Sequence, residues 1–186
     1  MTTYIGLLRG INVGGNKMVA MADLRDMITK IGFSDVKTLL QSGNVVFRAA
    51  AKVPAKLESQ LEAELEKRLG LKVEFHVRTA DEWRAVIAAN PFGAEAKKDP
   101  SHLLVSCFKA PLDKANVKAL QDAIAAMNGP ELLEADGRHL YMVFPDGIGN
   151  SKANRVIDRK LRALGTARNW NTVLKLAASC GPPASK

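Results

Sequence analysis

The sequence has no long hydrophobic run, few cysteines and few aromatic residues. Its 186 residues include no stretch of about 18 consecutive apolar residues, the length that a membrane-spanning helix requires. No basic segment followed by an apolar one stands near the start, so a signal peptide is not expected. With 47% hydrophobic and 25% charged residues, the composition is that of an ordinary globular protein. We therefore expect a cytoplasmic protein without a membrane partner.

The scarcity of cysteine and histidine argues against disulfides and metal sites. Cys107 lies in an apolar, strand-like run and Cys180 ends a helix-like run, so both are expected to be buried free thiols. His76, His102 and His139 are scattered, without metal-ligand spacing and without a neighbouring cysteine. The sequence predicts no metal and no cofactor.

The low aromatic content, 5%, argues against one common mode of nucleic-acid binding. RNA-binding sheets of the ferredoxin-like type stack bases on aromatic residues of their central strands. The first half of the chain offers only Tyr4 and Phe47 at such positions, without the rest of that pattern. A base-stacking platform is therefore not expected.

Charge is divided unevenly along the chain, whose net charge is +8. Residues 1–57 contain eight Lys or Arg and three Asp or Glu, residues 58–136 ten and fourteen, and residues 137–186 nine and two. If the fold brings the two basic segments together, one face will be positive and will favour anionic partners. A solubilising surface charge is the alternative interpretation.

Hydrophobic periodicity predicts the order βαββαβ in the first part of the chain. The expected strands and helices lie at 3–9, 20–31, 35–40, 45–49, 54–69 and 72–78. Gln41-Ser42-Gly43-Asn44 is a hairpin turn between the two middle strands. This order is typical of the ferredoxin-like fold, also called the alpha-beta plait.

The same order recurs after a capping box at Thr79–Glu82. The second set of expected elements lies at 102–109, 113–127, 131–136, 138–144, 151–164 and 166–168, with a further helix at 170–179. We therefore predict an α+β protein of two tandem ferredoxin-like units with an extra C-terminal helix. The expected divisions are 1–79 for the first unit, 80–101 for a helix and linker, 102–180 for the second unit and 181–186 for a disordered tail.

Two Gly/Asn-rich loops, each leading from an apolar strand toward a helix, are the most informative motifs. The first contains Arg9, Gly10, Asn12, Gly14, Gly15 and Lys17, and the second contains Gly147, Gly149, Asn150, Ser151 and Lys152. Glycines at such a junction free backbone N–H groups to converge on an anion, most often a phosphate. Neither spacing matches a dinucleotide-binding or P-loop motif, so a tight turn that requires glycine is the alternative.

The helix expected after the second loop extends its positive charge. Lys152, Arg155, Arg159 and Arg162 share one helical face, opposite Val156, Ile157, Leu161 and Leu164. Asn150 or Ser151 is a natural N-cap for this helix. Such a basic stripe suits a polyanion, although a solvated helix face would have the same pattern.

A third block, Arg168-Asn169-Trp170-Asn171-Thr172, stands just before the last expected helix. Either Asn can cap that helix, and Trp170 is expected to pack in the core rather than to stack on a base. No nucleophile–base–orienter set is visible anywhere, so no catalytic residue is predicted.

The blocks together resemble a known family. They are 8–15, 21–25, 41–47, 90–92, 146–152 and 168–172, and they look like the bacterial domain of unknown function 1697 family. The resemblance covers nearly the whole chain and implies two alpha-beta plait subdomains. It implies no activity, because the family has no established one, and it supplies no catalytic residues.

The leading hypothesis is a binding module for a phosphate-bearing ligand, either a nucleotide-like small molecule or a nucleic-acid backbone. The residues predicted to contact the anion are Arg9, Gly10, Asn12, Gly14, Gly15, Lys17, Ser42, Asn44, Gly147, Gly149, Ser151, Lys152, Arg155, Arg168, Asn169 and Asn171. One alternative is an enzyme that acts on a small anionic metabolite in a cleft between the two units. Another is a scaffold that binds partners through its sheet edges or through the acidic helix at 54–70.

Overall fold

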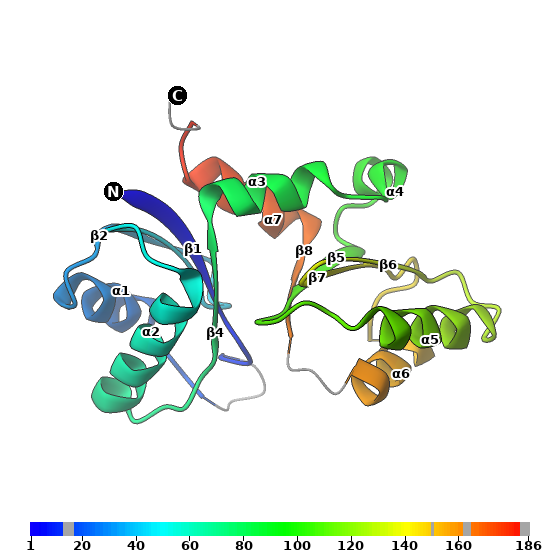
Figure 1. Cartoon of the computed structure of the whole chain (residues 1–186), viewed down its shortest axis with the longest axis horizontal. Helices are drawn as coiled ribbons and strands as arrows, with labels where there is room; N and C mark the ends of the chain where they lie inside the picture. Colours follow the sequence, from blue (N-terminus) through cyan, green and yellow to red (C-terminus); the bar gives the residue numbers. More distant parts are fainter. Residues whose placement is uncertain (13–16, 150, 162–164, 183–186) are drawn as a thin grey trace. The chain divides into compact units, whose positions relative to one another are not determined.

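The computed structural model describes residues 1–12, 17–149, 151–161 and 165–182. Contacts divide the chain into two units, Met1–Ala85 with Lys175–Lys186, and Val86–Leu174. Each unit contains one four-stranded antiparallel sheet, and the described residues form seven helices in all (Figure 1). The predicted mixed α+β class is confirmed, whereas the predicted domain limits stay predictions.

The first unit contains two helices between its four strands. In chain order the elements are β1 (Thr2–Leu8), α1 (Met21–Lys30), β2 (Ser34–Leu39), β3 (Asn44–Ala49), α2 (Pro54–Leu69) and β4 (Phe75–Thr79). The strands lie in the order β2-β3-β1-β4, and every neighbouring pair is antiparallel. Helices α1 and α2 contact each other and pack on this sheet (Figure 1).

Local sequence explains why α2 begins and ends where it does. Pro54 occupies the first helical position, where its missing N–H does no harm. Leu57, Leu61 and Leu65 recur every four residues and are all fully buried. Gly70 then ends the helix in the left-handed conformation, with φ of 66°.

Carboxylates close the β4 edge of this sheet. The amides of Phe75 and Val77 donate to Glu62 and Glu58 of α2, each at 2.8 Å. The amide of Thr79 donates to Glu82 at 2.7 Å. Alternate amides of an edge strand point away from the sheet and can recruit a further strand. Here the three alternate amides of β4 already have acceptors.

The strand expected at 72–78 begins three residues later than predicted. The register pairs Phe75 with Leu8, the last residue of β1. Lys72 and Val73 therefore have no β1 residue beside them, although they continue the alternating pattern. Just before β4, the Glu74 carbonyl accepts a hydrogen bond from the Arg9 amide of the first loop at 3.0 Å.

The second unit repeats the same order of elements. They are β5 (Leu103–Cys107), α5 (Lys114–Ala125), β6 (Leu132–Asp136), β7 (His139–Val143), α6 (Lys152–Leu161) and β8 (Thr166–Asn169). The strands lie in the order β6-β7-β5-β8, again all antiparallel. Helices α5 and α6 pack against each other over a core that includes Leu120, Ala153 and Ile157 (Figure 1).

Three further helices complete the described part of the chain. They are α3 (Ala80–Ala88), α4 (Gly93–Lys98) and α7 (Trp170–Ser179). Helix α4 lies within the segment expected as a linker, and both α3 and α7 have residues in each unit. Within the described ranges, no helix has both the length and the apolar character needed to cross a membrane.

Candidate functional site

The first Gly/Asn-rich loop follows β1, and its cations contact other residues of the same unit. Arg9 Nη1 lies 3.4 Å from Glu74 Oε2. Lys17 Nζ donates to the Lys72 carbonyl at 2.9 Å. Gly10 has φ of 62°, in the left-handed region that favours glycine. Gly14 and Gly15 lie outside the described residues. The two flanking cations therefore hold the loop to the segment before β4.

Asn12 binds backbone groups on both sides of this loop. Its Nδ2 donates to the carbonyls of Val19 and Gln41, at 3.0 and 2.7 Å, and its Oδ1 accepts the Val19 amide at 2.8 Å. Its own amide donates to the Lys17 carbonyl at 3.3 Å. The structure thus gives Asn12 a structural role within the loop, where the sequence predicted an anion contact.

The hairpin turn at Gln41–Asn44 packs directly against the first loop. A Cβ on Gly43 would lie 2.6 Å from Ile11 Cδ1 and 2.7 Å from Leu8 Cβ, and the Leu8 amide donates to the Gly43 carbonyl at 2.8 Å. Asn44 is fully buried and donates to the Leu39 carbonyl and to Ser42 Oγ, each at 2.9 Å. Two blocks that lie apart in the sequence therefore form one junction.

In the second loop, one of the amides predicted to face an anion instead donates to the backbone of the same loop. The Gly147 amide donates to the Phe144 carbonyl at 2.8 Å, in a turn where Gly147 has φ of 82°. Ser151 Oγ accepts the Ala153 amide at 3.0 Å and donates to Glu131. The hydrogen bond from the Ala153 amide confirms Ser151 as a cap of α6. A Cβ on Gly149 would meet open space, and Asn150 lies outside the described residues.

Helix α6 presents its cations to solvent. Lys152, Arg155 and Arg159 are exposed, whereas Ala153 and Ile157 are buried in the core of the second unit. Arg162 and Leu164, which the sequence placed on the same helix, lie outside the described residues. We name the set Lys152, Arg155 and Arg159 the α6 basic face. Among the described residues, none of its members forms an ion pair.

The third block is largely structural. Arg168 is buried at the end of β8, with Nη1 donating to Thr166 Oγ1 and to the Ala167 carbonyl, each at 2.8 Å. Burial lowers the pKa of this guanidinium to about 10. Asn169 Oδ1 accepts the Thr172 amide at 3.0 Å and so caps α7, while Trp170 is buried as expected. Asn171 is exposed.

The first unit has an equivalent of this block that sequence reasoning missed. Arg78 at the end of β4 is fully buried, donates to the Val77 carbonyl at 2.8 Å and lies 4.0 Å from Glu58. Thr79 follows as the cap of α3, whose Trp83 is buried. The signal is an Arg that ends a strand, a capping residue next to it, and a Trp within the following helix.

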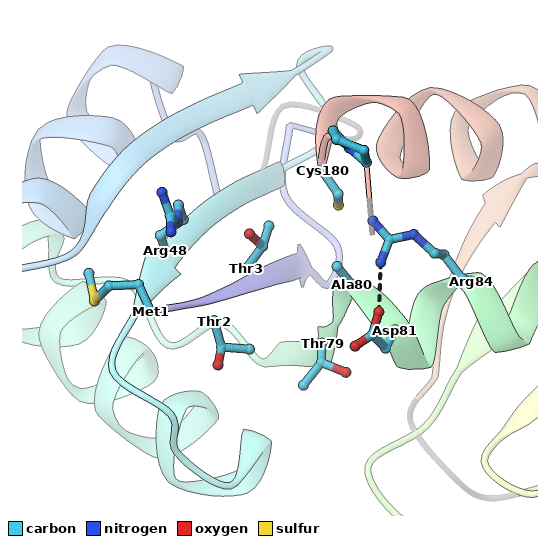
Figure 2. Close-up of a pocket in the computed structure, with 10 residues that line it drawn as sticks. Met1, Thr2, Thr3, Arg48, Thr79, Ala80, Asp81, Arg84 and Cys180 are labelled. Carbon is cyan, nitrogen blue, oxygen red and sulfur yellow. Dashed lines mark hydrogen bonds and ion pairs between the residues drawn. The ribbon is translucent and has the colours of Figure 1, made fainter. Parts of the chain in front are cut away.

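A pocket of about 380 Å³ in the first unit was also missed (Figure 2). Its lining residues are Met1, Thr2, Thr3, Arg48, Thr79, Ala80, Asp81, Arg84, Cys180 and Pro182. They come from β1 and the residue before it, from β3, from the end of β4, from α3 and from the residues after α7. Since no local pattern connects positions so far apart in the chain, no sequence signal pointed to this pocket.

The described residues contain no group of three or more His, Cys, Asp or Glu side chains that could hold a metal ion. Cys107 and Cys180 form no disulfide; Cys107 is buried and Cys180 half-buried. The enzyme hypothesis would use six polar residues of the sequence blocks: Asn12, Gln41, Ser42 and Asn44 belong to the first unit, and Asn169 and Asn171 to the second.

Comparison with known proteins identifies the family and supports the fold. The chain resembles the structure of the conserved bacterial protein SP0830 from Streptococcus pneumoniae, with a TM-score of 0.70 and 23% sequence identity over 96% of this chain and 98% of that chain. No curated protein matches the sequence. A family model described as "Protein of unknown function (DUF1697)" matches residues 1–141. The chain therefore belongs to the DUF1697 family of proteins of unknown function.

Proposed function

We propose that the protein binds a phosphate-bearing polyanion, a nucleic-acid backbone, through the α6 basic face. The observation that carries this proposal is the exposure of Lys152, Arg155 and Arg159 without an ion-pair partner among the described residues. Exposed, unpaired cations on one helical face attract phosphates and release counterions when they bind them.

The spacing of these cations suits a linear ligand. Positions 152, 155 and 159 are three and four residues apart, so they rise by about 4.5 and 6 Å along the helix axis. Three charges therefore follow one line of about 10 Å. Ser151, which caps the helix, stands at the start of this line.

The cations of the first loop fit this role less well. Arg9 pairs with Glu74, and Lys17 donates to the Lys72 carbonyl. A ligand would have to replace both contacts, whereas it would replace no described ion pair on α6. We therefore propose the second loop and α6, rather than the first loop, as the contact surface.

Contact through phosphates also agrees with the positions of the aromatic residues. Tyr4 and Phe47 are buried and stack on each other with ring centroids 5.6 Å apart. Trp83, Tyr141 and Trp170 are buried as well. Bases have no aromatic platform on these side chains, so we propose binding without strong base preference.

We further propose that both units are ferredoxin-like, on the basis of the element order βαββαβ and of the strand orders β2-β3-β1-β4 and β6-β7-β5-β8. A cytoplasmic location, expected from the sequence, is part of the same proposal, because nucleic acids are available there.

Titration of a labelled single-stranded oligonucleotide by fluorescence anisotropy tests the proposed function. Each neutralised phosphate contributes about −0.7 to the slope of log K against log salt, so three contacts predict a slope of about −2. The triple variant Lys152→Gln, Arg155→Gln, Arg159→Gln should lose measurable binding. Glutamine keeps a helix propensity close to that of Lys and Arg, so α6 should remain folded.

The matched control removes three charges from the helices of the first unit. Lys30, Lys56 and Lys67 are all exposed on α1 or α2, and their replacement by Gln should leave the affinity and the salt slope nearly unchanged. Equal loss in both triple variants would show a general charge effect and contradict the proposal. Absence of oligonucleotide binding at low salt, with binding to anionic vesicles or to an acidic peptide instead, would also overturn it.

A further inference from the structure

The Figure 2 pocket brings two arginines of the first unit to one place. Arg48 comes from β3 and Arg84 from α3, and Figure 2 shows them on either side of Thr3. A neighbouring hollow of about 170 Å³ shares Thr3, Arg48 and Cys180 with it. A volume of about 380 Å³ falls within the range of small-molecule sites.

Both arginines pair with carboxylates that are open to solvent. Arg48 Nη1 lies 3.3 Å from Asp35, whose side chain is 61% exposed. Arg84 Nη1 lies 2.7 Å from Asp81, whose side chain is 83% exposed, and its Nη2 donates to the Gly181 carbonyl at 2.9 Å. Exposed ion pairs contribute little net stability, so an incoming oxyanion can replace these carboxylates.

The rest of the lining is suited to an oxyanion and its attached group. Thr3, the register partner of Arg48, supplies a hydroxyl group on the side of the two arginines, while Met1, Ala80 and Pro182 supply apolar surface. Asp81 is the one carboxylate among the ten lining residues, against two guanidinium groups. Guanidinium groups bind carboxylates and phosphates through paired N–H donors.

We propose that this pocket binds a small molecule that carries a phosphate or carboxylate group, with Arg48 and Arg84 holding its oxygens. The site is separate from the α6 basic face, which belongs to the second unit, and does not depend on the function proposed above. The Thr3 hydroxyl donates to, or accepts from, the remainder of the ligand.

Cys180 is a built-in reporter for this site. Its thiol lines the pocket and is half-buried, whereas Cys107 is fully buried. Alkylation of the native protein by iodoacetamide should therefore modify Cys180 first. A ligand that covers the thiol divides the alkylation rate by 1 + [ligand]/Kd. The rate therefore halves when the ligand concentration equals its Kd.

The experiment measures the alkylation rate of Cys180 by mass spectrometry, with inorganic phosphate, with acetate and with chloride at matched ionic strength. We expect phosphate, acetate or both to slow alkylation relative to chloride, and the stronger of the two identifies the anionic group. The protection should disappear in Arg48→Gln and in Arg84→Gln. Arg25→Gln is the matched control, because Arg25 is exposed on α1 of the same unit and does not line the pocket.

Arg84 also affects the thiol directly, so protection is compared within each variant. Burial raises the pKa of the Cys180 thiol and the charge of Arg84 opposes that rise, so Arg84→Gln should slow alkylation even without ligand. Resonances of the Arg48 and Arg84 Nε–H groups, followed by NMR during phosphate titration, give a second readout that does not use the thiol. Equal rates in all three anions without resonance shifts would overturn the proposal, as would undiminished protection in both arginine variants.

Discussion

Helices α2 and α6 occupy the same position in the two units, each between the third and fourth strand, but they carry opposite chemistry. On α2, Glu58 and Glu62 accept amides of β4, and Arg68 pairs with Glu64. Helix α6 contains no Glu and presents Lys152, Arg155 and Arg159 to solvent. The helix that closes a strand edge in the first unit thus has a cationic, solvent-exposed counterpart in the second.

This difference separates a structural helix from a candidate binding helix in one repeated topology. The α2 carboxylates satisfy amides that would otherwise lie unpaired along β4, and their removal should affect folding. The α6 cations stabilise no described contact, and their removal should affect only binding. Since β4 is closed, a scaffold that binds partners by strand addition would need another edge.

The largest loss of stability should come from Glu58→Ala, which tests whether α2 is a structural helix. The Val77 amide would lose its acceptor, and the fully buried Arg78 would lose the carboxylate 4.0 Å away. Breaking a buried, charge-assisted contact costs about 3–5 kcal/mol. Urea denaturation measures the change in the free energy of unfolding.

Glu66→Ala is the matched control for this prediction. Glu66 also lies on α2, but its side chain is 52% exposed and, within the described ranges, its ion-pair partner is Lys72. Its loss should change the free energy of unfolding by about 0.5 kcal/mol or less. If Glu58→Ala were no more destabilising than Glu66→Ala, α2 would have no special role at the β4 edge.

The next largest difference in stability should come from glycine-to-alanine changes in the two hairpin turns. In Gly43→Ala the new Cβ would lie 2.6 Å from Ile11 Cδ1, and overpacking of this kind costs about 1–3 kcal/mol. Gly137 occupies the corresponding turn of the second unit, with φ of 54° and nothing within 4 Å of a new Cβ. Gly137→Ala should therefore lower the free energy of unfolding only by the penalty for a left-handed non-glycine residue, about 1–2 kcal/mol. Gly43→Ala should lose this amount as well as the overpacking cost. Thermal denaturation of both variants decides whether the turns differ as described.

The helix caps should behave alike in both units, with smaller effects. Thr79 Oγ1 accepts the Glu82 amide at the start of α3, and Asn169 Oδ1 accepts the Thr172 amide at the start of α7. Replacement of either residue by Ala should cost about 1 kcal/mol. Denaturant midpoints are measured for the two variants. If these midpoints differ strongly, one of the caps has a further role.

The smallest effect concerns the pH dependence of the Arg68–Glu64 pair on α2. The hydrogen bond from Arg68 lowers the pKa of Glu64 below its ordinary value of 4.5. A lowered folded-state pKa stabilises the protein at pH above that ordinary value, and the contribution is lost as pH falls through the folded-state pKa. NMR titration should show the Glu64 pKa rising toward 4.5 in Arg68→Gln. An unchanged pKa would mean that the pair does not persist in solution.

The sequence anticipated much of the local structure. The hairpin turn at Gln41–Asn44, the Thr79–Glu82 capping box and the amphipathic pattern of α6 all depend on residues a few positions apart. It also anticipated burial of Trp170. The family resemblance agrees with the match over residues 1–141.

The candidate site was predicted less completely, because its residues lie far apart in the chain. Arg9 meets Glu74 across 65 positions, and Lys17 meets the Lys72 carbonyl across 55. The sequence predicted an anion contact for Arg9 and Lys17 and could not show these intramolecular partners; the anion contact stays a prediction. Arg168 was also predicted to contact the anion, and the structure shows that it is buried.

By itself, the sequence determined the order of strands and helices apart from α4, several caps and turns, and the cationic stripe of α6, because periodicity and capping act between residues close in the chain. Only the tertiary structure decided which charges are engaged and which remain exposed. Packing of α2 beside β4 brings Glu58 to Val77, and the assembled first unit brings Thr3, Arg48, Arg84 and Cys180 around one pocket. Such distant pairs depend on how the sheet assembles, which no local pattern encodes.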